Sequence, residues 1–153
     1  MKIVEWDEYT TLLDKLNESI QLRSFDGIVA IGRGGCIIGA FLASKLGLPT
    51  FYPVFVRHVG RGNNVRIVAH DTISSFMNTL AQTEFLQGNF LVVDDWLCEG
   101  RAMKFILDRM PKGASVTTMV MFNRKGSEFK PDYVGEYLEE EEREIMFPYD
   151  ALG

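Results

Sequence analysis

Continuous apolar runs recur along this chain, each bounded by turn residues. A short apolar run of this kind is typical of a strand buried on both faces of a sheet. The runs fall at residues 27–31, 50–56, 90–95 and 115–122. Pro53 places the second run at a sheet edge or a bulge, because proline cannot donate a ladder hydrogen bond. Residues 133–134 and 145–147 predict two further short strands.

Helical spacing of apolar residues marks the segments between these runs. Such segments cover residues 7–22, 35–46 and 100–109. Asp7 is the expected N-cap of the first helix, and Gly47 follows the second helix where a C-cap glycine belongs. The spacing predicts that the third helix turns one apolar face inward. That face consists of Met103, Ile106, Leu107 and Met110.

Residues 57–88 are the least regular part of the sequence. A turn cluster lies at residues 60–64, and residues 65–69 predict a short strand. Residues 72–86 predict a helix or a mobile excursion. A segment this long between core elements often covers a binding site, so we expect a lid region here.

The order of these elements predicts the fold class. Strand, glycine turn, helix and strand follow one another twice, which indicates an α/β fold with a parallel twisted sheet and helices on both faces. The length of 153 residues suits a single domain over residues 1–153. Sheets of this kind bind ligands beyond the carboxyl ends of their strands. Two glycine-containing loops, at residues 32–35 and 94–100, are expected there.

Composition narrows the classes of function. Apolar residues make up 46% of the chain and the net charge is −5. We therefore expect no nucleic-acid or anionic-membrane partner, and a solvated acidic patch at Glu136 and Glu139–Glu142. The two cysteines, Cys36 and Cys98, form no metal or disulfide motif. With neither a signal peptide nor an apolar run of membrane-spanning length, we expect a cytoplasmic protein.

The first loop, GRGG at residues 32–35, contains the residues of an anion site. Glycines let backbone N–H groups converge on one point, and the following helix adds the positive end of its dipole. Arg33 adds a planar cation suited to phosphate. A tight strand-to-helix turn with an exposed arginine explains the same residues, so this loop alone leaves both interpretations open.

The second loop begins with Asp94 and Asp95, directly after an apolar run. Neighbouring strand residues point to opposite faces, so two adjacent carboxylates are not a packing solution. They suit ribose hydroxyls and a magnesium ion, Mg2+. An acidic strand end that caps the next turn is the alternative. Taken together with GRGG, the pair favours a ligand site.

Four segments in this order resemble the type I phosphoribosyltransferases, and most closely the small bacterial xanthine-guanine enzymes. The segments are VEWDEYTTLLDKL, FDGIVAIGRGGCIIGAFLASKLGLP, FLVVDDWLCEG, and KPDYVGEYL followed by IMFPYD. The resemblance covers most of the chain outside residues 57–88. It implies the fold of that family, with a lid region, a small C-terminal hood and a homodimer or homotetramer. It also implies transfer of a 5-phosphoribosyl group from phosphoribosyl pyrophosphate to a nucleobase, with a purine as the expected acceptor.

The resemblance also implies roles for single residues. The catalytic residues would be Asp94, Asp95 and Glu99, with the two aspartates facing the ribose hydroxyls and Mg2+. Pyrophosphate would lie against Arg33, Gly34 and Gly35. The 5′-phosphate would bind the backbone amides of Cys98, Glu99, Gly100, Arg101 and Ala102. The purine would meet Arg124 or Lys125 through its exocyclic oxygen, and the backbone of Ile145.

The loop after the two aspartates departs from the family's pattern, which is an acidic residue, threonine, glycine, any residue and threonine. Here it reads Cys98-Glu99-Gly100-Arg101-Ala102. Both threonine hydroxyls are absent, and Cys98 replaces the acidic residue proposed as the family's general base. Glu99 is the nearest substitute for that base. Arg101 could offset the negative charge that Glu99 brings close to a phosphate.

Two hypotheses follow. The first is an enzyme in which Mg2+ and Arg33 neutralise the leaving pyrophosphate while a lid excludes water. The second is a binding or regulatory protein on the same fold, which binds a nucleotide or phosphoribosyl ligand without efficient turnover. The altered loop favours the second, as does Glu144 at the place of the family's stacking aromatic, with Phe147 or Tyr149 as replacements. The paired aspartates and GRGG lead us to expect the enzyme.

Overall fold

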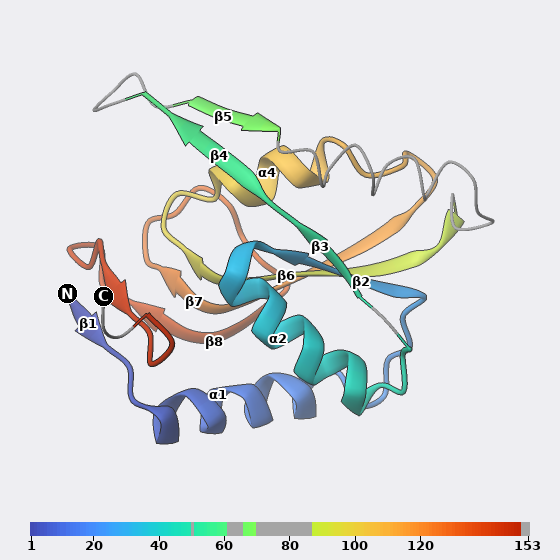
Figure 1. Cartoon of the computed structure of the whole chain (residues 1–153), viewed down its shortest axis with the longest axis horizontal. Coiled ribbons are helices and arrows are strands. Elements are labelled where there is room, and N and C mark those ends of the chain that lie inside the picture. Colours follow the sequence, from blue (N-terminus) through green and yellow to red (C-terminus); the bar gives the residue numbers. More distant parts are fainter. Residues whose placement is uncertain (50, 61–65, 70–86, 151–153) are drawn as a thin grey trace.

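Five parallel strands form the central sheet of the computed structural model, which describes residues 1–49, 51–60, 66–69 and 87–150 (Figure 1). The strand order is β3-β2-β6-β7-β8. The strands are β2 (Gly27–Ile31), β3 (Tyr52–Val54), β6 (Asn89–Leu97), β7 (Ser115–Arg124) and β8 (Tyr133–Leu138). Each predicted apolar run therefore contains a strand of one parallel sheet, although the strand in the run at residues 50–56 covers only Tyr52–Val54. Pro53 lies in the edge strand β3, where the sequence placed it.

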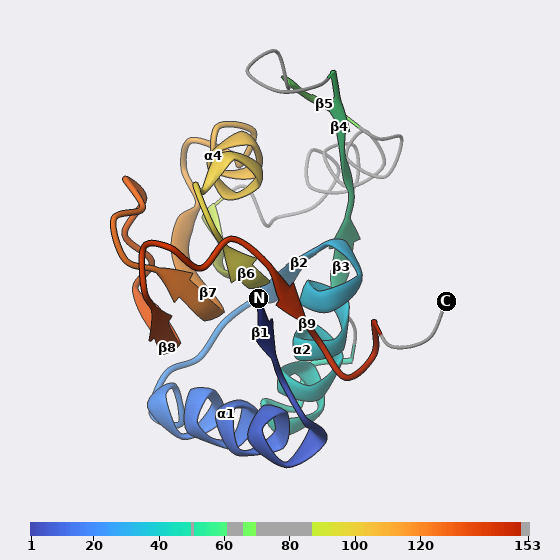
Figure 2. The ribbon, with the colours of Figure 1, turned by 90° about the vertical axis from the view of Figure 1, so that its left-hand side faces the viewer.

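Helices cover both faces of this sheet, as predicted. α1 (Trp6–Ser19) and α2 (Gly32–Lys45) lie on one face, and α4 (Arg101–Leu107) lies on the other (Figure 2). Alternate residues of β2 enter the two core layers: Ile28 packs in the α1–α2 layer and Val29 in the α4 layer. Every residue of β2 is buried. Burial of one such aliphatic side chain contributes about 1.5–3 kcal/mol, so the central strands stabilise the fold most.

Several predicted helix boundaries were wrong. α1 ends at Ser19 and not at residue 22, and α4 covers Arg101–Leu107 and not residues 100–109. The N-cap of α1 is Glu5, and Asp7 lies in the first turn, where its charge favours the positive end of the helix dipole. α2 begins at Gly32, so GRGG is the first turn of the helix and not a loop before it. Gly47 has φ +69° just beyond the C-cap of α2, which confirms its predicted place.

The predicted end of β6 was also wrong. The strand continues to Leu97, and its parallel pairing with β7 includes Asp94 with Val120 and Trp96 with Phe122. Asp94 and Asp95 are therefore strand residues with fixed backbone directions. The apolar side chains of Trp96 and Leu97 pack against the two core layers, which explains why pairing continues past two charged residues.

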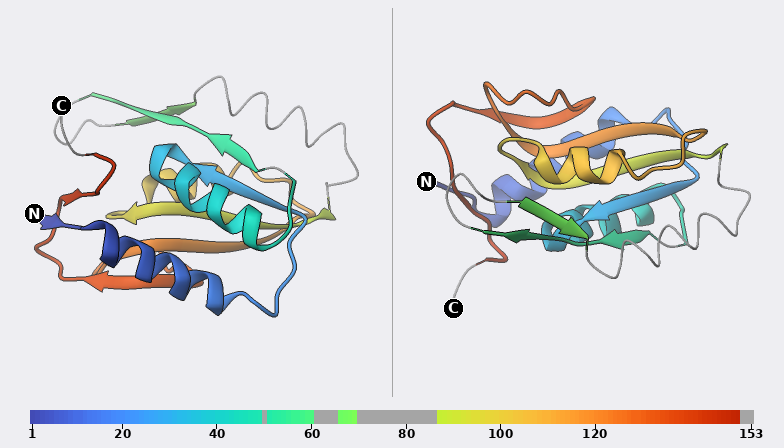
Figure 3. Two further views of the ribbon diagram at one scale, coloured as in Figure 1. Left: turned by 60° about the horizontal axis from the view of Figure 1, so that its bottom comes forward. Right: turned by 90° about the horizontal axis from the view of Figure 1, so that it is seen from above.

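A two-stranded antiparallel hairpin stands apart from the central sheet (Figure 3). It consists of β4 (Val56–Val59) and β5 (Arg66–Ala69). The strand predicted over residues 65–69 is confirmed. The helix or excursion predicted at residues 72–86, which is part of the expected lid region at residues 57–88, lies outside the described residues. Within the described part of the chain, no helix is long and apolar enough to cross a membrane.

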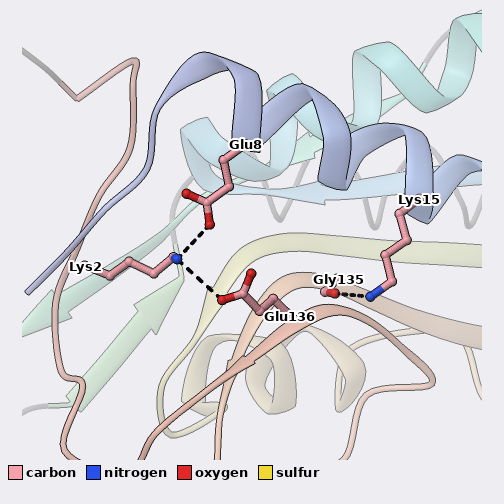
Figure 4. A network of polar contacts seen from close by, with 5 residues as sticks. All are labelled: Lys2, Glu8, Lys15, Gly135 and Glu136. Carbon is pink, nitrogen blue, oxygen red and sulfur yellow. Dashed lines mark hydrogen bonds and ion pairs between the residues drawn. The ribbon is translucent and has the colours of Figure 1, made fainter.

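Segments near the two ends of the chain pair beside the carboxyl ends of the strands. β1 (Lys2–Ile3) and β9 (Ile145–Met146) form a parallel two-stranded sheet (Figure 2). Lys2 Nζ lies 2.7 Å from Glu8 and 3.4 Å from Glu136, which joins β1 to α1 and β8 (Figure 4). Although burial opposes it, these two carboxylates raise the pKa of Lys2.

The acidic patch near the C-terminus is partly ion-paired, and not simply solvated as predicted. Glu136 pairs with Lys2, Glu139 pairs with Lys125, and Glu142 lies 2.9 Å from the N-terminal amino group. Exposed pairs of this kind contribute little individually, about 0–1 kcal/mol. Their effect is to lower the negative charge of this surface.

Candidate active site

One cavity of about 480 Å³ lies at the carboxyl ends of β2 and β6. Its lining comprises residues 31–34, 56, 58, 94–103 and 149–150. The two loops that the sequence singled out therefore meet, as expected for strand ends of a parallel sheet. His58, from the segment that follows the second strand, lines the same cavity.

The first turn of α2 packs directly against β6, and this packing requires glycine. A Cβ on Gly34 would lie 1.7 Å from Asp95 Oδ2, and a Cβ on Gly35 would lie 2.8 Å from the carbonyl oxygen of Val93. Both distances are shorter than any real contact of a Cβ atom. The close approach of α2 to β6 is therefore enough to require glycine at both positions, whether or not a ligand binds there. Gly35 faces the strand and lines no described cavity.

Arg33 is the exposed cation of this turn. Its side chain is 82% exposed, and its guanidinium lies 3.6 Å from the carboxylate of Asp150. An ion pair this exposed and this long is weak. Arg33 can therefore exchange Asp150 for an anionic ligand in the cavity.

Asp94 and Asp95 form a concentrated negative charge at the end of β6. Asp94 Oδ1 accepts a 2.9 Å hydrogen bond from the backbone N–H of Asp95. Burial raises the pKa of the Asp94 carboxyl well above its usual range, and the negative charge of Asp95 adds to the shift. In the described part of the chain, neither carboxylate has an ion pair with a cation.

Tyr149 fixes the direction of Asp95. Its phenol donates a 2.6 Å hydrogen bond to Asp95 Oδ2, on the side that faces Gly34. The ring is stacked on Phe147, with centroids 5.1 Å apart, and meets Tyr9 edge-on at 5.6 Å. Burial and the charge of Asp95 both raise the pKa of Tyr149, so the phenol stays a neutral donor.

This contact was missed by the reasoning from sequence. Tyr149 was considered only as a possible stacking aromatic, and the bond to Asp95 spans 54 residues of chain. No local pattern predicts a bond of that length in sequence. The stacking partner of Tyr149 is Phe147, whose ring is buried in the core, so Phe147 lies outside the cavity.

The loop from Cys98 to Ala102 forms another wall of the cavity. Arg101 and Glu99 form an ion pair of 2.7 Å, and both side chains are about half exposed, at 54% and 47%. Gly100 has φ +80°, and a Cβ there would lie 2.6 Å from Phe129 Cβ, so no other residue fits. Glu99 therefore pairs with Arg101 on the other side of Gly100, and Arg101 offsets the negative charge of Glu99 as expected.

The comparisons with known proteins agree with this geometry. A model of the phosphoribosyl transferase domain family matches residues 5–151. The chain belongs to this family.

Relatives of known sequence and structure extend over nearly the whole chain. A xanthine-guanine phosphoribosyltransferase from Idiomarina loihiensis is 28% identical over 159 positions, covering 96% of this chain and 85% of that protein. A purine phosphoribosyltransferase from Pyrococcus horikoshii has a TM-score of 0.76 at 19% identity, covering 99% and 94% of the two chains. A hypothetical protein from Neisseria gonorrhoeae with bound ppGpp has a TM-score of 0.74 at 24% identity, covering 99% and 90%.

Three residues to which the phosphoribosyltransferase resemblance gave a base-binding role lie outside the cavity. Arg124 is buried, and its Nε and Nη1 donate to the carbonyl oxygens of Cys98 (3.1 Å) and Glu140 (3.3 Å). Lys125 forms an ion pair with Glu139. Ile145 lies in β9 and pairs with Lys2 of β1. The structure therefore gathers the ribose and phosphate residues of the prediction except Gly35, and does not bring these three base-binding residues to them.

The aspartate pair fits the magnesium ion that a phosphoribosyltransferase implies. Burial, together with the charge of Asp95, raises the pKa of Asp94, and a bound cation would compensate the charge of both carboxylates. Within the described residues no cluster of three or more His, Cys, Asp or Glu could hold a metal alone. Mg2+ commonly takes one or two carboxylates and completes its shell with water and substrate oxygens, so this donor set suits it.

Proposed function

We propose that this protein transfers a 5-phosphoribosyl group from phosphoribosyl pyrophosphate to a purine base and releases pyrophosphate. The observation that carries the proposal is the meeting of Asp94, Asp95 and residues 32–34 of the GRGG turn around one cavity. Membership of the phosphoribosyl transferase family supports it. The purine acceptor is inferred from the names of the relatives, which are xanthine-guanine and purine phosphoribosyltransferases.

The roles proposed for the residues follow from their positions. Asp94 would hold Mg2+, which would neutralise charge on the leaving pyrophosphate. Asp95, oriented by Tyr149, would accept hydrogen bonds from the ribose hydroxyls. Arg33 would leave Asp150 and bind the pyrophosphate. The backbone amides of residues 98–102 would receive the 5′-phosphate.

In the proposed reaction, a base nitrogen forms a bond to C1′ of the ribose as the bond from C1′ to the pyrophosphate oxygen breaks. The proton of that nitrogen passes to a general base, for which Glu99 is the candidate. Positive charge develops on the ribose, so the nearby carboxylates stabilise the transition state more than the ground state. The chain's contribution is therefore orientation and electrostatics.

Pyrophosphate release tests this proposal directly. The native chain, phosphoribosyl pyrophosphate and Mg2+ are combined with adenine, guanine, hypoxanthine, xanthine or uracil in separate reactions. Release is expected with at least one purine and not with uracil. Absence of release with every purine would reject the enzyme.

A second candidate is a binding protein that retains the ligand site without efficient turnover. The Glu99–Arg101 ion pair favours it, because the two residues satisfy each other where the family's loop has hydroxyl donors. The Neisseria gonorrhoeae structure, solved with bound ppGpp, is a relative in fold that holds a nucleotide. Calorimetric titration separates the candidates: heat with phosphoribosyl pyrophosphate and Mg2+, together with no pyrophosphate release, identifies the binder.

Three further expectations accompany the proposal. Binding of phosphoribosyl pyrophosphate is expected to require Mg2+, which titration in a chelator tests. A homodimer or homotetramer is expected, and light scattering gives the mass. A cytoplasmic location is expected, which cell fractionation checks.

A further inference from the structure

A second cavity, of about 440 Å³, adjoins the same loop. It lies between the start of α4 and the segment at residues 126–128, and we name it the rear cavity. Glu99 and Arg101 line both this cavity and the active-site cavity. The loop of residues 98–102 therefore contributes to the walls of both, while the aspartate pair lines only the active-site cavity.

Arg124 is a buried positive charge in the wall of the rear cavity. The residue is 8% exposed, and its two hydrogen bonds go to the backbone carbonyls of Cys98 and Glu140. Within the part of the chain that the structure describes, no carboxylate forms an ion pair with it. A buried charge without a counter-charge is strongly unfavourable, so an anion beside Arg124 would relieve it.

Ser127 gives a second and independent indication of a missing partner. The residue is 3% exposed and belongs to the wall of the rear cavity. Its Oγ has no hydrogen-bond partner among the described residues. Buried hydroxyl groups in native proteins almost always have a partner, and an unmade hydrogen bond costs stability. Its Oγ is closed to solvent, so a phosphate oxygen accepts from this hydroxyl only after residues 126–128 shift.

The charges around the rear cavity leave room for one anionic group. Arg101 is paired with Glu99, so these two charges cancel. Lys104 lies 3.6 Å from Glu128, and the two side chains are 50% and 88% exposed, so this pair is weak. Lys104 can therefore turn to a ligand. A further carboxylate, that of Glu140, lies against Gly126, where a Cβ would be 2.5 Å from its Oε1. Glu140 is exposed and, among the described residues, forms no ion pair with Arg124, so the buried charge of Arg124 keeps no direct counter-charge.

We propose that the rear cavity binds the phosphate group of a second ligand, which is separate from the substrate in the active-site cavity. Arg124, Ser127 and Lys104 supply the donors, and either free phosphate or a phosphate monoester fits them. The ligand acts as an effector, because Arg124 also holds the carbonyl oxygen of Cys98 in the loop that the two cavities share. The proposal does not depend on the activity proposed above.

The test follows the backbone amide signals of Gly126, Ser127 and Lys104 by nuclear magnetic resonance while inorganic phosphate is added. In the native chain these signals are expected to shift with a common Kd. Lys104→Glu is expected to weaken that Kd about tenfold or more, because it replaces a charge-assisted donor by a repelling carboxylate. Ser127→Ala is expected to weaken it as well, and to leave the unliganded fold as stable as before, since the lost hydroxyl had no partner.

Two matched charge reversals serve as controls. Lys112→Glu changes the net charge equally at an exposed residue that lines neither cavity. Arg33→Glu makes the same change in the active-site cavity. Both are expected to keep the native Kd at the rear amides. Ribose 5-phosphate is the second probe. A Kd at the same amides that is tighter for ribose 5-phosphate than for inorganic phosphate identifies a phosphate monoester as the ligand, and the reverse identifies free phosphate. The proposal is overturned if the rear amides do not respond to either probe, or respond in Lys104→Glu or Ser127→Ala as they do in the native chain.

Discussion

The phenol of Tyr149 donates a 2.6 Å hydrogen bond to Asp95 Oδ2, joining the segment after β9 to the end of β6. The next residue, Asp150, lies beside Arg33 at the first turn of α2. The consecutive residues Tyr149 and Asp150 thus contact the carboxylate of Asp95 and the guanidinium of Arg33 in the proposed site. The segment after β9 therefore contributes contacts to the proposed active site and is more than a cover for it.

Replacement of Tyr149 by phenylalanine tests whether this bond orients Asp95 during the reaction. We expect Tyr149→Phe to keep its fold, because the ring still stacks on Phe147. We expect kcat/KM for pyrophosphate release to fall about tenfold or more, since a hydrogen bond to a charged group contributes about 1.5–3 kcal/mol. Tyr137→Phe, at a tyrosine that is 54% exposed, is the matched control. Equal kinetics in both variants would show that the bond is not used.

The raised pKa of Asp94 predicts a pH-dependent loss of stability. The folded chain keeps this carboxyl protonated to a higher pH than the unfolded chain does, because burial and Asp95 disfavour its charge. The folded state therefore binds more protons, and stability falls as pH rises above the ordinary value of 3.8 and through the raised pKa. Below that ordinary value, the carboxyl is protonated in both states and has no effect.

Asp94→Asn should remove this penalty while it abolishes Mg2+ binding. At pH 7 in a chelator we expect a higher Tm than in the native chain, by about 2–4 °C for each kcal/mol recovered. The gain should disappear near pH 3.5. Asp14→Asn, at an exposed residue of α1, should leave the Tm unchanged at both values of pH. A lower Tm of Asp94→Asn at neutral pH would contradict the prediction.

Gly34 should tolerate no side chain while Asp95 keeps its position. We expect Gly34→Ala to lower stability by about 1–3 kcal/mol and to reduce activity, because its Cβ would overlap Asp95 Oδ2. The double variant Gly34→Ala with Asp95→Ala should recover part of that stability. Urea unfolding of the native chain, both single variants and the double variant gives the coupling free energy. Additive effects would show that the clash with Asp95 is not the cause.

Restoring the family's pattern in the loop should separate the two candidate functions. We expect the triple variant Cys98→Asp, Glu99→Thr and Ala102→Thr to raise kcat/KM about tenfold or more, because it supplies a general base and two hydroxyl donors. Cys98→Asn with the same two threonines differs only in the group that can accept a proton, and should gain less. If neither variant exceeds the native chain, the unusual loop is not what limits turnover.

The strands could be predicted from sequence because a buried strand has a local apolar pattern. The meeting of the two loops could be predicted because it follows from the topology of a parallel sheet. Apolar runs such as residues 27–31 indicate buried strands, and parallel strands bring their carboxyl ends together. The direction of Asp95 could not be predicted, because it depends on Tyr149, which is remote in sequence. The end of β6 could not be predicted either. Two charged residues suggest the end of a buried strand, but Trp96 and Leu97 pack against the core and the strand continues through them.

The base-binding roles of Arg124 and Lys125 stay predictions for a similar reason. The sequence places both residues at the end of β7, but their hydrogen-bond and ion-pair partners lie in other segments of the chain. Arg124 donates to the carbonyls of Cys98 and Glu140, and Lys125 pairs with Glu139. A side chain of this length can reach several partners from one backbone position, so its contacts depend on how the segments pack.

The parallel pairing of β1 with β9 has a consequence for synthesis of the chain. Lys2 pairs with Ile145, so β1, which is synthesised before the other described strands, has no partner until nearly all of the described residues have followed it. The central sheet can form earlier, because its strands lie between these two segments. Residues 145–150 then bring Tyr149 to Asp95 last, so a nascent chain stalled before this segment would hold a folded sheet and an unfinished active site.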